Sequence, residues 1–468
     1  MVLRCAPSGW IHDMNLALPN YFLADLPPGA TLTQTLIEEA CQTLKRNRES
    51  YLVQRTTPAI IRLLGELAEN WLQAQYPFRA MALEHGPKAT GFSAATLAAG
   101  LDGFFKELTA ENLQALLVQD LGQAQRLDNP TAGSAEQKAQ RAAIATGPEL
   151  LAHVTAGRIP NPAFTSIVLG LLTRSAQFVK CPTGGSFLPR LFAHSIYDAD
   201  PKLGACLEIA EWRGGTAHLE TTLFQQVDCV TATGSDEALA AIRRHVPPKA
   251  RLLAYGHRVS FAYITKESLS GSSPKKIVAR AASDVVAWNQ LGCLSPHVIY
   301  VENGGAVLPD HFAQMLAEEL ARREQTEPRG ELPVKSAAAI ASRRAFYEVR
   351  AAHSPDTQRW GSENSTAWTV IYEADPRFQL SCLNRFIYVK GVRSLAEVLQ
   401  NADSVRGSVS TVGLEAPEEL ATEIVAQLAR WGVTRVCPLG RMQNPPLTWR
   451  HDGRPSLGDL VTWTDWEQ

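Results

Sequence analysis

The sequence predicts an α/β protein in which a mainly helical N-terminal third precedes two α/β units. Three observations lead to this fold class. Apolar residues recur at helical spacing over residues 1–125, short β-rich runs alternate with helical segments from Gly147, and a second alternating series follows Tyr255. Alternation of this kind is typical of a parallel, doubly wound sheet, which binds ligands at the carboxyl ends of its strands.

The elements are expected in the following order. Helices of the N-terminal third are expected at residues 32–47, 57–75, 92–106 and 110–125, before an exposed connection at 128–134. The first α/β unit has expected strands at 150–154, 176–179, 205–210, 226–231 and 252–254, with helices at 162–173, 187–198, 220–224 and 236–245. The second has strands at 261–265, 297–301, 368–372 and 386–389, helices at 273–288, 310–323 and 395–401, and polar loops at 324–333 and 353–365.

Composition bounds the function. A chain of 468 residues is too long for one core, so two or three domains are expected. The net charge of -2 gives no basic surplus, which argues against binding to nucleic acid or an anionic membrane. The eight cysteines form no CxxC pair and no metal-ligand spacing, a pattern typical of reduced cytoplasmic thiols without a metal site. The first residues lack a signal peptide's apolar segment, and the apolar stretch at 163–172 is too short to span a bilayer, so a soluble cytoplasmic protein is expected.

Cys293 is the candidate nucleophile. It follows the helix expected at 273–288 and precedes an apolar strand, so it is expected in a loop. Gly292 has no Cβ and allows close approach of a substrate to the backbone. A thiol in such a loop can accept an acyl group from a thioester or attack an aldehyde. The alternative is that Cys293 is a small buried apolar residue, as free cysteines usually are.

Two segments are candidates for holding phosphate or ribose. Gly234 and Ser235 follow an expected strand and begin an expected helix, whose free N–H groups can bind phosphate. The alternative is an ordinary helix N-cap. Lys180 ends another expected strand, and Thr183 and two glycines follow it, leaving space for anionic groups. The alternative there is a solvated lysine.

The order Lys180, Gly234-Ser235, Cys293 is that of the aldehyde dehydrogenase superfamily. More closely, the chain resembles the bacterial acyl-CoA reductases of the LuxC type. The matching stretches are residues 191–196 (LFAHSI), 211–215 (EWRGG), 232–237 (ATGSDE), 255–260 (YGHRVS), 289–296 (NQLGCLSP), 411–414 (TVGL) and 449–453 (WRHDG). The cysteine segment and the WRHDG stretch together are specific, and the resemblance extends from residue 150 to the end of the chain.

The resemblance implies an aldehyde-dehydrogenase-like fold with a helical N-terminal region and a Rossmann-like NADP-binding domain in residues 1–257. A catalytic domain would occupy 258–440 and a C-terminal segment 441–468. The implied activity is NADPH-dependent reduction of an acyl-CoA, expected to be a fatty acyl-CoA, to the aldehyde through an acyl-Cys293 intermediate. Gly234 and Ser235 would approach the pyrophosphate and Lys180 the adenosine ribose. Relatives that use NAD commonly carry a glutamate where this chain has Thr183, and its absence favours NADPH.

The chain also departs from the superfamily pattern. Ala254 stands where oxidising relatives have the glutamate that activates water, which favours a reductase. The asparagine that usually stabilises the oxyanion is missing from its place in the pattern. Either Arg158 or Asn161 replaces this donor, or the backbone N–H of Cys293 acts alone. His257 is a candidate proton donor, with a structural histidine as the alternative.

Two other functions remain open at this point. One is a CoA-acylating dehydrogenase of a short aldehyde, and the other is a degenerate relative that binds acyl-CoA or a partner without catalysis, which Arg158 favours. The resemblance implies an acyl-transferring protein partner and an even-numbered homo-oligomer.

Overall fold

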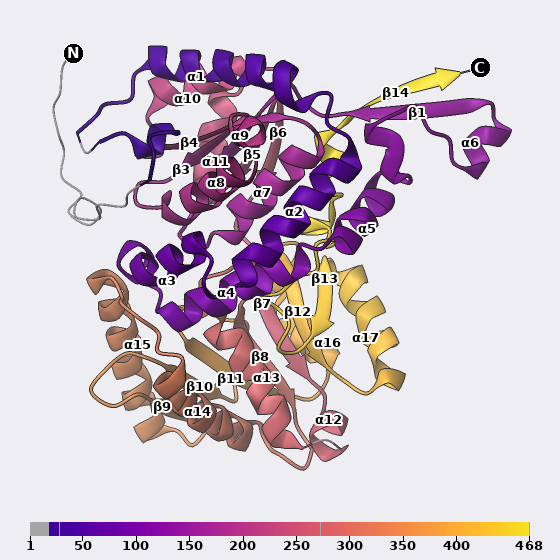
Figure 1. Ribbon diagram of the computed structural model, residues 1–468. Helices are drawn as coiled ribbons and strands as arrows, with labels where there is room; N and C mark the ends of the chain where they lie inside the picture. The colour runs from indigo at the N-terminus through magenta and orange to yellow at the C-terminus, as the bar shows by residue number, and fades with distance from the viewer. Residues whose placement is uncertain (1–17, 28, 272, 468) are drawn as a thin grey trace. The chain divides into compact units, whose positions relative to one another are not determined.

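A computed structural model describes residues 18–27, 29–271 and 273–467. The chain divides into two compact units (Figure 1). Unit 1 comprises Met1–Thr90, Leu101–Gly256 and Pro446–Gln468, and unit 2 comprises Gly91–Gly100 and His257–Pro445.

Unit 1 is built on a five-stranded parallel sheet in the order β4-β3-β2-β5-β6. The strands are β2 (Leu150–Val154), β3 (Ala176–Cys181), β4 (Leu207–Glu211), β5 (Cys229–Thr233) and β6 (Arg251–Tyr255). The chain adds β3 and β4 on one side of β2, and then β5 and β6 on the other. The carboxyl edge beside β2 is therefore the point where the winding reverses, which is where such sheets bind ligands. The predicted parallel, doubly wound sheet is confirmed.

Helices cover both faces of this sheet. α1 (Gln34–Asn47) and α10 (Ala217–Gln226) lie side by side on one face, where Ile37 and Leu223 share a core with Phe178 of β3 (Figure 1). α7 (Asn161–Leu172) and α8 (Phe187–Ala199) pack with α2 (Thr57–Leu72), whose Trp71 donates a hydrogen bond to Ser195 of α8. The remaining helices of the unit are α3 (Pro77–Thr90), α5 (Ala110–Leu121), α6 (Ser134–Lys138), α9 (Pro201–Gly204) and α11 (Asp236–His245).

The four helices expected in the N-terminal third are present. One of them, α4 (Ala94–Glu107), belongs to both units: its residues up to Gly100 are in unit 2 and those from Leu101 are in unit 1. α3 was missed because its sequence carries Pro87 and its apolar residues do not follow one face.

Unit 2 is built on a seven-stranded sheet in the order β13-β12-β7-β8-β11-β10-β9. Its strands are β7 (Val259–Ile264), β8 (Pro296–Glu302), β9 (Thr357–Gly361), β10 (Thr369–Glu373), β11 (Phe386–Val392), β12 (Val409–Glu415) and β13 (Arg435–Pro438). All pairs are parallel except β9 with β10.

Two apolar cores lie on the two faces of the unit 2 sheet. α13 (Pro274–Val286) and α14 (Pro309–Thr326) contribute to one, and α15 (Val334–His353), α16 (Leu395–Asn401) and α17 (Glu418–Trp431) to the other. α12 (Lys266–Gly271) is a short helix after β7.

Three expectations for unit 2 were wrong or incomplete. The polar loop expected at 353–365 contains β9, which pairs antiparallel at the sheet edge. The helix expected to reach residue 288 ends at Val286, because Trp288 and Asn289 have left-handed φ angles of 49° and 53°. The expected loop at 324–333 begins only after α14 ends at Thr326.

A separate two-stranded antiparallel sheet joins distant parts of unit 1. β1 (Arg141–Thr146) pairs with β14 (Thr462–Glu467), in the register Arg141 with Glu467 (Figure 1). The sequence did not predict this pair, because its two strands come from opposite ends of the unit.

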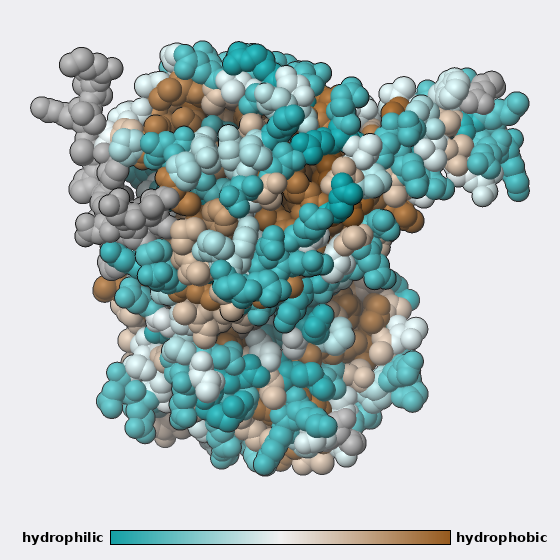
Figure 2. Space-filling model, in the orientation of Figure 1, coloured by the Kyte–Doolittle hydropathy of each residue, from teal (hydrophilic) through white to brown (hydrophobic). Residues whose placement is uncertain are grey.

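The visible face of the molecule is hydrophilic over most of its area, with scattered hydrophobic residues (Figure 2). No helix within the described ranges is both long enough and apolar enough to cross a membrane.

Candidate active site

Cys293 lies at the tip of a tight turn directly before β8. The Ser295 N–H donates to the Gly292 carbonyl at 2.9 Å, so Cys293 and Leu294 are the central residues of a four-residue turn. Cys293 is exposed, and this excludes the alternative of a buried apolar cysteine. The other cysteines within the described ranges are Cys41, Cys181, Cys206, Cys229 and Cys437, which are buried, and Cys382, which is half-buried.

Burial also changes the pKa of the other thiols. It raises the pKa of Cys181 and of Cys206 to about 12, so these thiols stay protonated at neutral pH. The thiolate is the nucleophilic form of cysteine. Exposure in a defined turn is therefore the structural feature that distinguishes Cys293 from these thiols.

A strained segment leads into this turn. Trp288, Asn289 and Gln290 all have positive φ angles, of 49°, 53° and 63°. Such angles are uncommon outside glycine and persist where the surroundings enforce them. Gln290 is fully buried, and its side-chain N–H₂ donates to the carbonyls of Pro296 at 2.7 Å and Phe386 at 2.9 Å. Gln290 thus ties the segment to the amino ends of β8 and β11.

A second buried glutamine, Gln443, fixes the other side of the turn. Its Nε2 donates to Ser295 Oγ, and a Cβ placed on Gly292 would lie 2.3 Å from the same Nε2. Gly292 is therefore required here by close packing as well as by approach to a substrate. Sequence reasoning missed both glutamines, although Gln290 belongs to the NQLGCLSP stretch.

His257 lies in the short connection between β6 and β7 and is exposed. His257 is near His297, which is buried at the start of β8. Burial, with a smaller contribution from His257, lowers the pKa of His297 to about 4, so His297 is neutral at physiological pH. His297 Nδ1 accepts the Ser381 N–H at 3.1 Å. His297 is thus structural, and the role of His257 as a proton donor stays a prediction.

In unit 1, Lys180 ends β3 and is only 3% exposed, which excludes the solvated-lysine alternative. Burial lowers its pKa, opposed by the nearby carboxylates of Glu220 and Glu211. The ammonium lies 5.7 Å from the Trp212 ring centre, and no other described residue forms a hydrogen bond or ion pair with it. A buried cation without a bonded anion is costly unless a ligand supplies the partner. The binding of a cofactor ribose or phosphate by Lys180 stays a prediction.

The carboxylates near Lys180 are committed to the two adjoining loops. Glu211 accepts the N–H of Gly184 at 2.8 Å and of Ser186 at 3.2 Å, and Glu220 accepts the N–H of Gly215 at 3.0 Å. Thr183 is exposed in the first of these loops. Sequence reasoning did not assign Glu211 and Glu220, and the EWRGG stretch was the signal that could have found Glu211.

Gly234 and Ser235 follow β5 at the same carboxyl edge, with β2 between β5 and β3. Ser235 Oγ accepts the Ala238 N–H at 3.3 Å and caps α11. A Cβ on Gly234 would only contact Ala238 at 3.4 Å, an ordinary distance. The geometry is therefore compatible with both a phosphate-facing helix end and a plain N-cap.

Neither predicted side-chain donor to an oxyanion is fixed in that role. Arg158 is exposed and donates to the Thr90 carbonyl at 3.2 Å. Asn161 is the first residue of α7, and its Oδ1 is buried without a hydrogen-bond partner. The identity of the donor stays a prediction.

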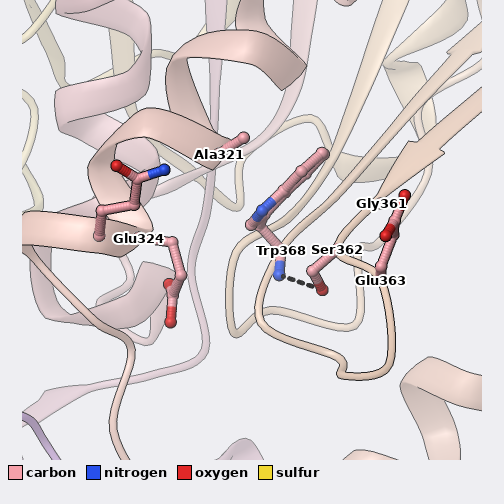
Figure 3. A pocket seen from close by; sticks show the side chains of 7 residues that line it. Ala321, Glu324, Gly361, Ser362, Glu363 and Trp368 are labelled. Carbon is pink, nitrogen blue, oxygen red and sulfur yellow. Dashed lines mark hydrogen bonds between the residues drawn. The ribbon is translucent and has the colours of Figure 1, made fainter.

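A surface cavity of about 460 Å³ lies in unit 2 (Figure 3). It lies between the end of α14 and the loop after β9, and Trp368 forms one wall. Its lining residues are Ala321, Glu324, Gln325, Gly361, Ser362, Glu363 and Trp368. Cys293 does not line this cavity.

Solved structures place the fold in a known class. The chain superimposes with a TM-score of 0.67 on a NAD-dependent benzaldehyde dehydrogenase from Corynebacterium glutamicum, with 12% identity, 94% of this chain and 91% of that chain. A putative aldehyde dehydrogenase from Anabaena variabilis gives a TM-score of 0.67 at 14% identity, covering 94% of each chain. The protein has the aldehyde dehydrogenase fold, as predicted.

The family is narrower than the fold. A model of the family described as acyl-CoA reductase (LuxC) matches residues 52–463, and the chain belongs to this family. Among curated relatives, a long-chain acyl-protein thioester reductase of Aliivibrio fischeri is 25% identical over 68% of this chain, and one of Photobacterium leiognathi is 24% identical over 68%. The match spans 63% of the length of each of these relatives.

Proposed function

We propose that this protein reduces a long-chain acyl thioester to the aldehyde, with NADPH as the reductant. The observation that carries the proposal is the exposed Cys293, held in a defined turn in a chain of the acyl-CoA reductase (LuxC) family. The relatives named as long-chain acyl-protein thioester reductases support the class of substrate.

The chemistry assigned to Cys293 proceeds in two steps. The Cys293 thiolate attacks the thioester carbonyl, an acyl–Sγ bond forms, and the bond to the leaving thiol breaks as that sulfur takes a proton. When bound, the reduced nicotinamide supplies the hydride that reduces the acyl group. The aldehyde then leaves as the carbon–Sγ bond breaks, and the Cys293 thiolate is restored.

Ala254, the residue before the end of β6, supports reduction over hydrolysis. It stands where the resemblance places the water-activating glutamate of oxidising relatives, and its side chain cannot act as a base. An acyl group on Cys293 then persists until it is reduced or returned to a thiol. His257 is the residue proposed to exchange protons with the leaving thiol.

The carboxyl edge of the unit 1 sheet is proposed to hold the cofactor. Lys180 would bind the adenosine ribose and its 2′-phosphate, and Thr183 would add no further negative charge to the nearby carboxylates of Glu211 and Glu220. The start of α11 at Gly234-Ser235 would face the pyrophosphate. The acyl group is proposed to arrive as acyl-CoA or on an acyl-carrying protein partner, with the acyl–Cys293 intermediate common to both.

Acylation of the purified protein tests this function. Radiolabelled long-chain acyl-CoA should label wild-type protein at Cys293, and NADPH should release the label as aldehyde. Cys293→Ala should abolish labelling and NADPH oxidation, whereas Cys382→Ala, at the half-buried cysteine, should retain both. Labelling of Cys293→Ala, or binding of acyl-CoA without acylation of Cys293, would overturn the proposal. The latter result would favour a non-catalytic binding protein.

A further inference from the structure

We propose that Ser260 is a positioning residue for Cys293, and that its hydroxyl selects the turn conformation in which the thiol is reactive. This inference rests on the proposed role of Cys293 as the nucleophile. It concerns a residue that does not itself touch the reacting atoms.

Ser260 bonds directly to the backbone of the nucleophile. It lies in β7 and is fully buried, and its Oγ donates to the Cys293 carbonyl at 2.8 Å. The Thr411 N–H of β12 donates to the same Oγ at 3.2 Å. A hydroxyl has one hydrogen. With Thr411 as a donor, that hydrogen is directed at the Cys293 carbonyl.

The sheet is irregular on both sides of Ser260. The pairing with β8 shifts between Ser260, opposite Pro296, and Phe261, opposite Val298. The pairing with β12 shifts between Val409 and Thr411. Irregularities of this kind interrupt ladder hydrogen bonds and redirect side chains, and they are frequent beside active sites. At this irregularity the Thr411 N–H donates its hydrogen bond to the Ser260 hydroxyl.

The bond to the Cys293 carbonyl fixes the central peptide of the turn. In a four-residue turn this peptide has two orientations, which distinguish the type I and type II forms. A trans peptide directs its N–H opposite to its C=O. Holding the Cys293 carbonyl toward β7 therefore directs the Leu294 N–H away from β7. Loss of the hydroxyl removes this selection and lets the peptide rotate.

Two other side chains form hydrogen bonds elsewhere in the loop. Gln290 binds the carbonyls of Pro296 and Phe386, and Gln443 binds the Ser295 side chain. These bonds anchor the two ends of the turn, whereas Ser260 holds the peptide that joins its two central residues.

The test is the reactivity of Cys293 in full-length variants. Ser260→Ala should lower the rate of iodoacetamide alkylation at Cys293, and kcat for acyl-CoA reduction, by roughly 5- to 30-fold, the range expected for one buried hydrogen bond. KM should stay within about twofold. The matched control is Ser410→Ala on β12, because Ser410 is also buried and its Oγ has no hydrogen-bond partner. This control should react as wild type does.

If Ser260→Ala does not fold, two variants of similar shape that differ in the hydroxyl group can be compared instead. Ser260→Thr retains the hydroxyl and Ser260→Val lacks it, so Thr should react at least fivefold faster than Val. Equal alkylation rates in this pair, or equal losses in Ser260→Ala and Ser410→Ala, would overturn the inference. Alkylation needs no substrate, so its result does not depend on whether the protein reduces acyl-CoA. The proposed function fails separately, if Cys293→Ala still reduces acyl-CoA.

Discussion

Three residues, Gly292, Gln443 and Ser260, shape the turn that carries Cys293. Gly292 provides the space that the Gln443 amide occupies, and Ser260 bonds the Cys293 carbonyl. Because turn residues are otherwise adaptable, these contacts hold Cys293, the proposed nucleophile, in one geometry. Errors of about 1 Å in the position of a reacting group cost roughly 100-fold in rate, so such contacts have direct catalytic consequences.

Gly292→Ala is expected to lower the acylation rate of Cys293 by roughly 10- to 100-fold, because the added methyl group displaces Gln443 from Ser295. Gly292→Ala combined with Gln443→Ala should recover part of the rate by removing the clash. The control is Gly65→Ala in α2, where the nearest atom to the new Cβ is 4.0 Å away. Pre-steady-state acylation measures all three, and a wild-type rate in Gly292→Ala would contradict the steric argument.

Lys180→Met should raise the melting temperature of the cofactor-free protein, because it removes a buried charge that no described residue pairs. The same change should weaken NADPH binding by about 10- to 100-fold, the value of one charge-assisted hydrogen bond. Fluorescence titration and thermal unfolding measure the two effects. Lys202→Met, at an exposed position of the same unit, should change neither. A destabilised Lys180→Met with normal NADPH affinity would make Lys180 a structural residue.

At the scale of elements, α13 supports the turn that carries Cys293 through the segment that contains Gln443. Asp284 is buried in α13 and accepts the N–H of Gly440 at 2.6 Å and of Met442 at 2.9 Å. These bonds place the segment after β13, and with it Gln443. Burial raises the pKa of Asp284 to about 7. The Asp284 carboxyl group thus connects α13, the segment after β13 and, through Gln443, the turn that carries Cys293.

The raised pKa predicts how stability depends on pH. Between the unfolded-state value of 3.8 and about 7, folding takes up a proton, so the contribution of Asp284 is complete below 3.8 and falls as pH rises to 7. Asp284→Asn removes this titration and one of two acceptor oxygens. Urea unfolding should show a larger loss in the variant at pH 5 than at pH 7.5, with a slope of up to about 1.4 kcal/mol per pH unit. A difference that does not depend on pH would contradict the assignment.

At the scale of the whole molecule, the chain returns to unit 1 after completing unit 2. Arg251 of β6 donates to the carbonyls of Asp459, Leu460 and Val461 at 3.2, 2.7 and 3.0 Å. His451 stacks on Tyr255 with ring centres 4.2 Å apart. His451 of the WRHDG stretch thus contributes to this closure at the end of β6.

Arg251→Ala should lower the free energy of unfolding by about 1–3 kcal/mol, because three backbone carbonyls lose their donor. It should also expose residues 446–467 to limited proteolysis. Arg141→Ala is the matched control, since it breaks only the exposed ion pair with Asp465 and should cost about 0–1 kcal/mol. Equal stability losses, without a change in cleavage near the C-terminus, would show that Arg251 does not secure this segment.

The sequence by itself determined the α/β class, the positions of most strands and helices up to Asn401, and the candidates Cys293 and Lys180. It could do so because periodicity and strand-to-helix alternation are local properties. The tertiary structure decided which distant residues meet. The Ser260–Thr411 and Asp284–Gly440 bonds join residues 151 and 156 positions apart. They exist because β12 inserts beside β7 and β13 follows it, an order set by packing of the whole sheet and not by any local pattern.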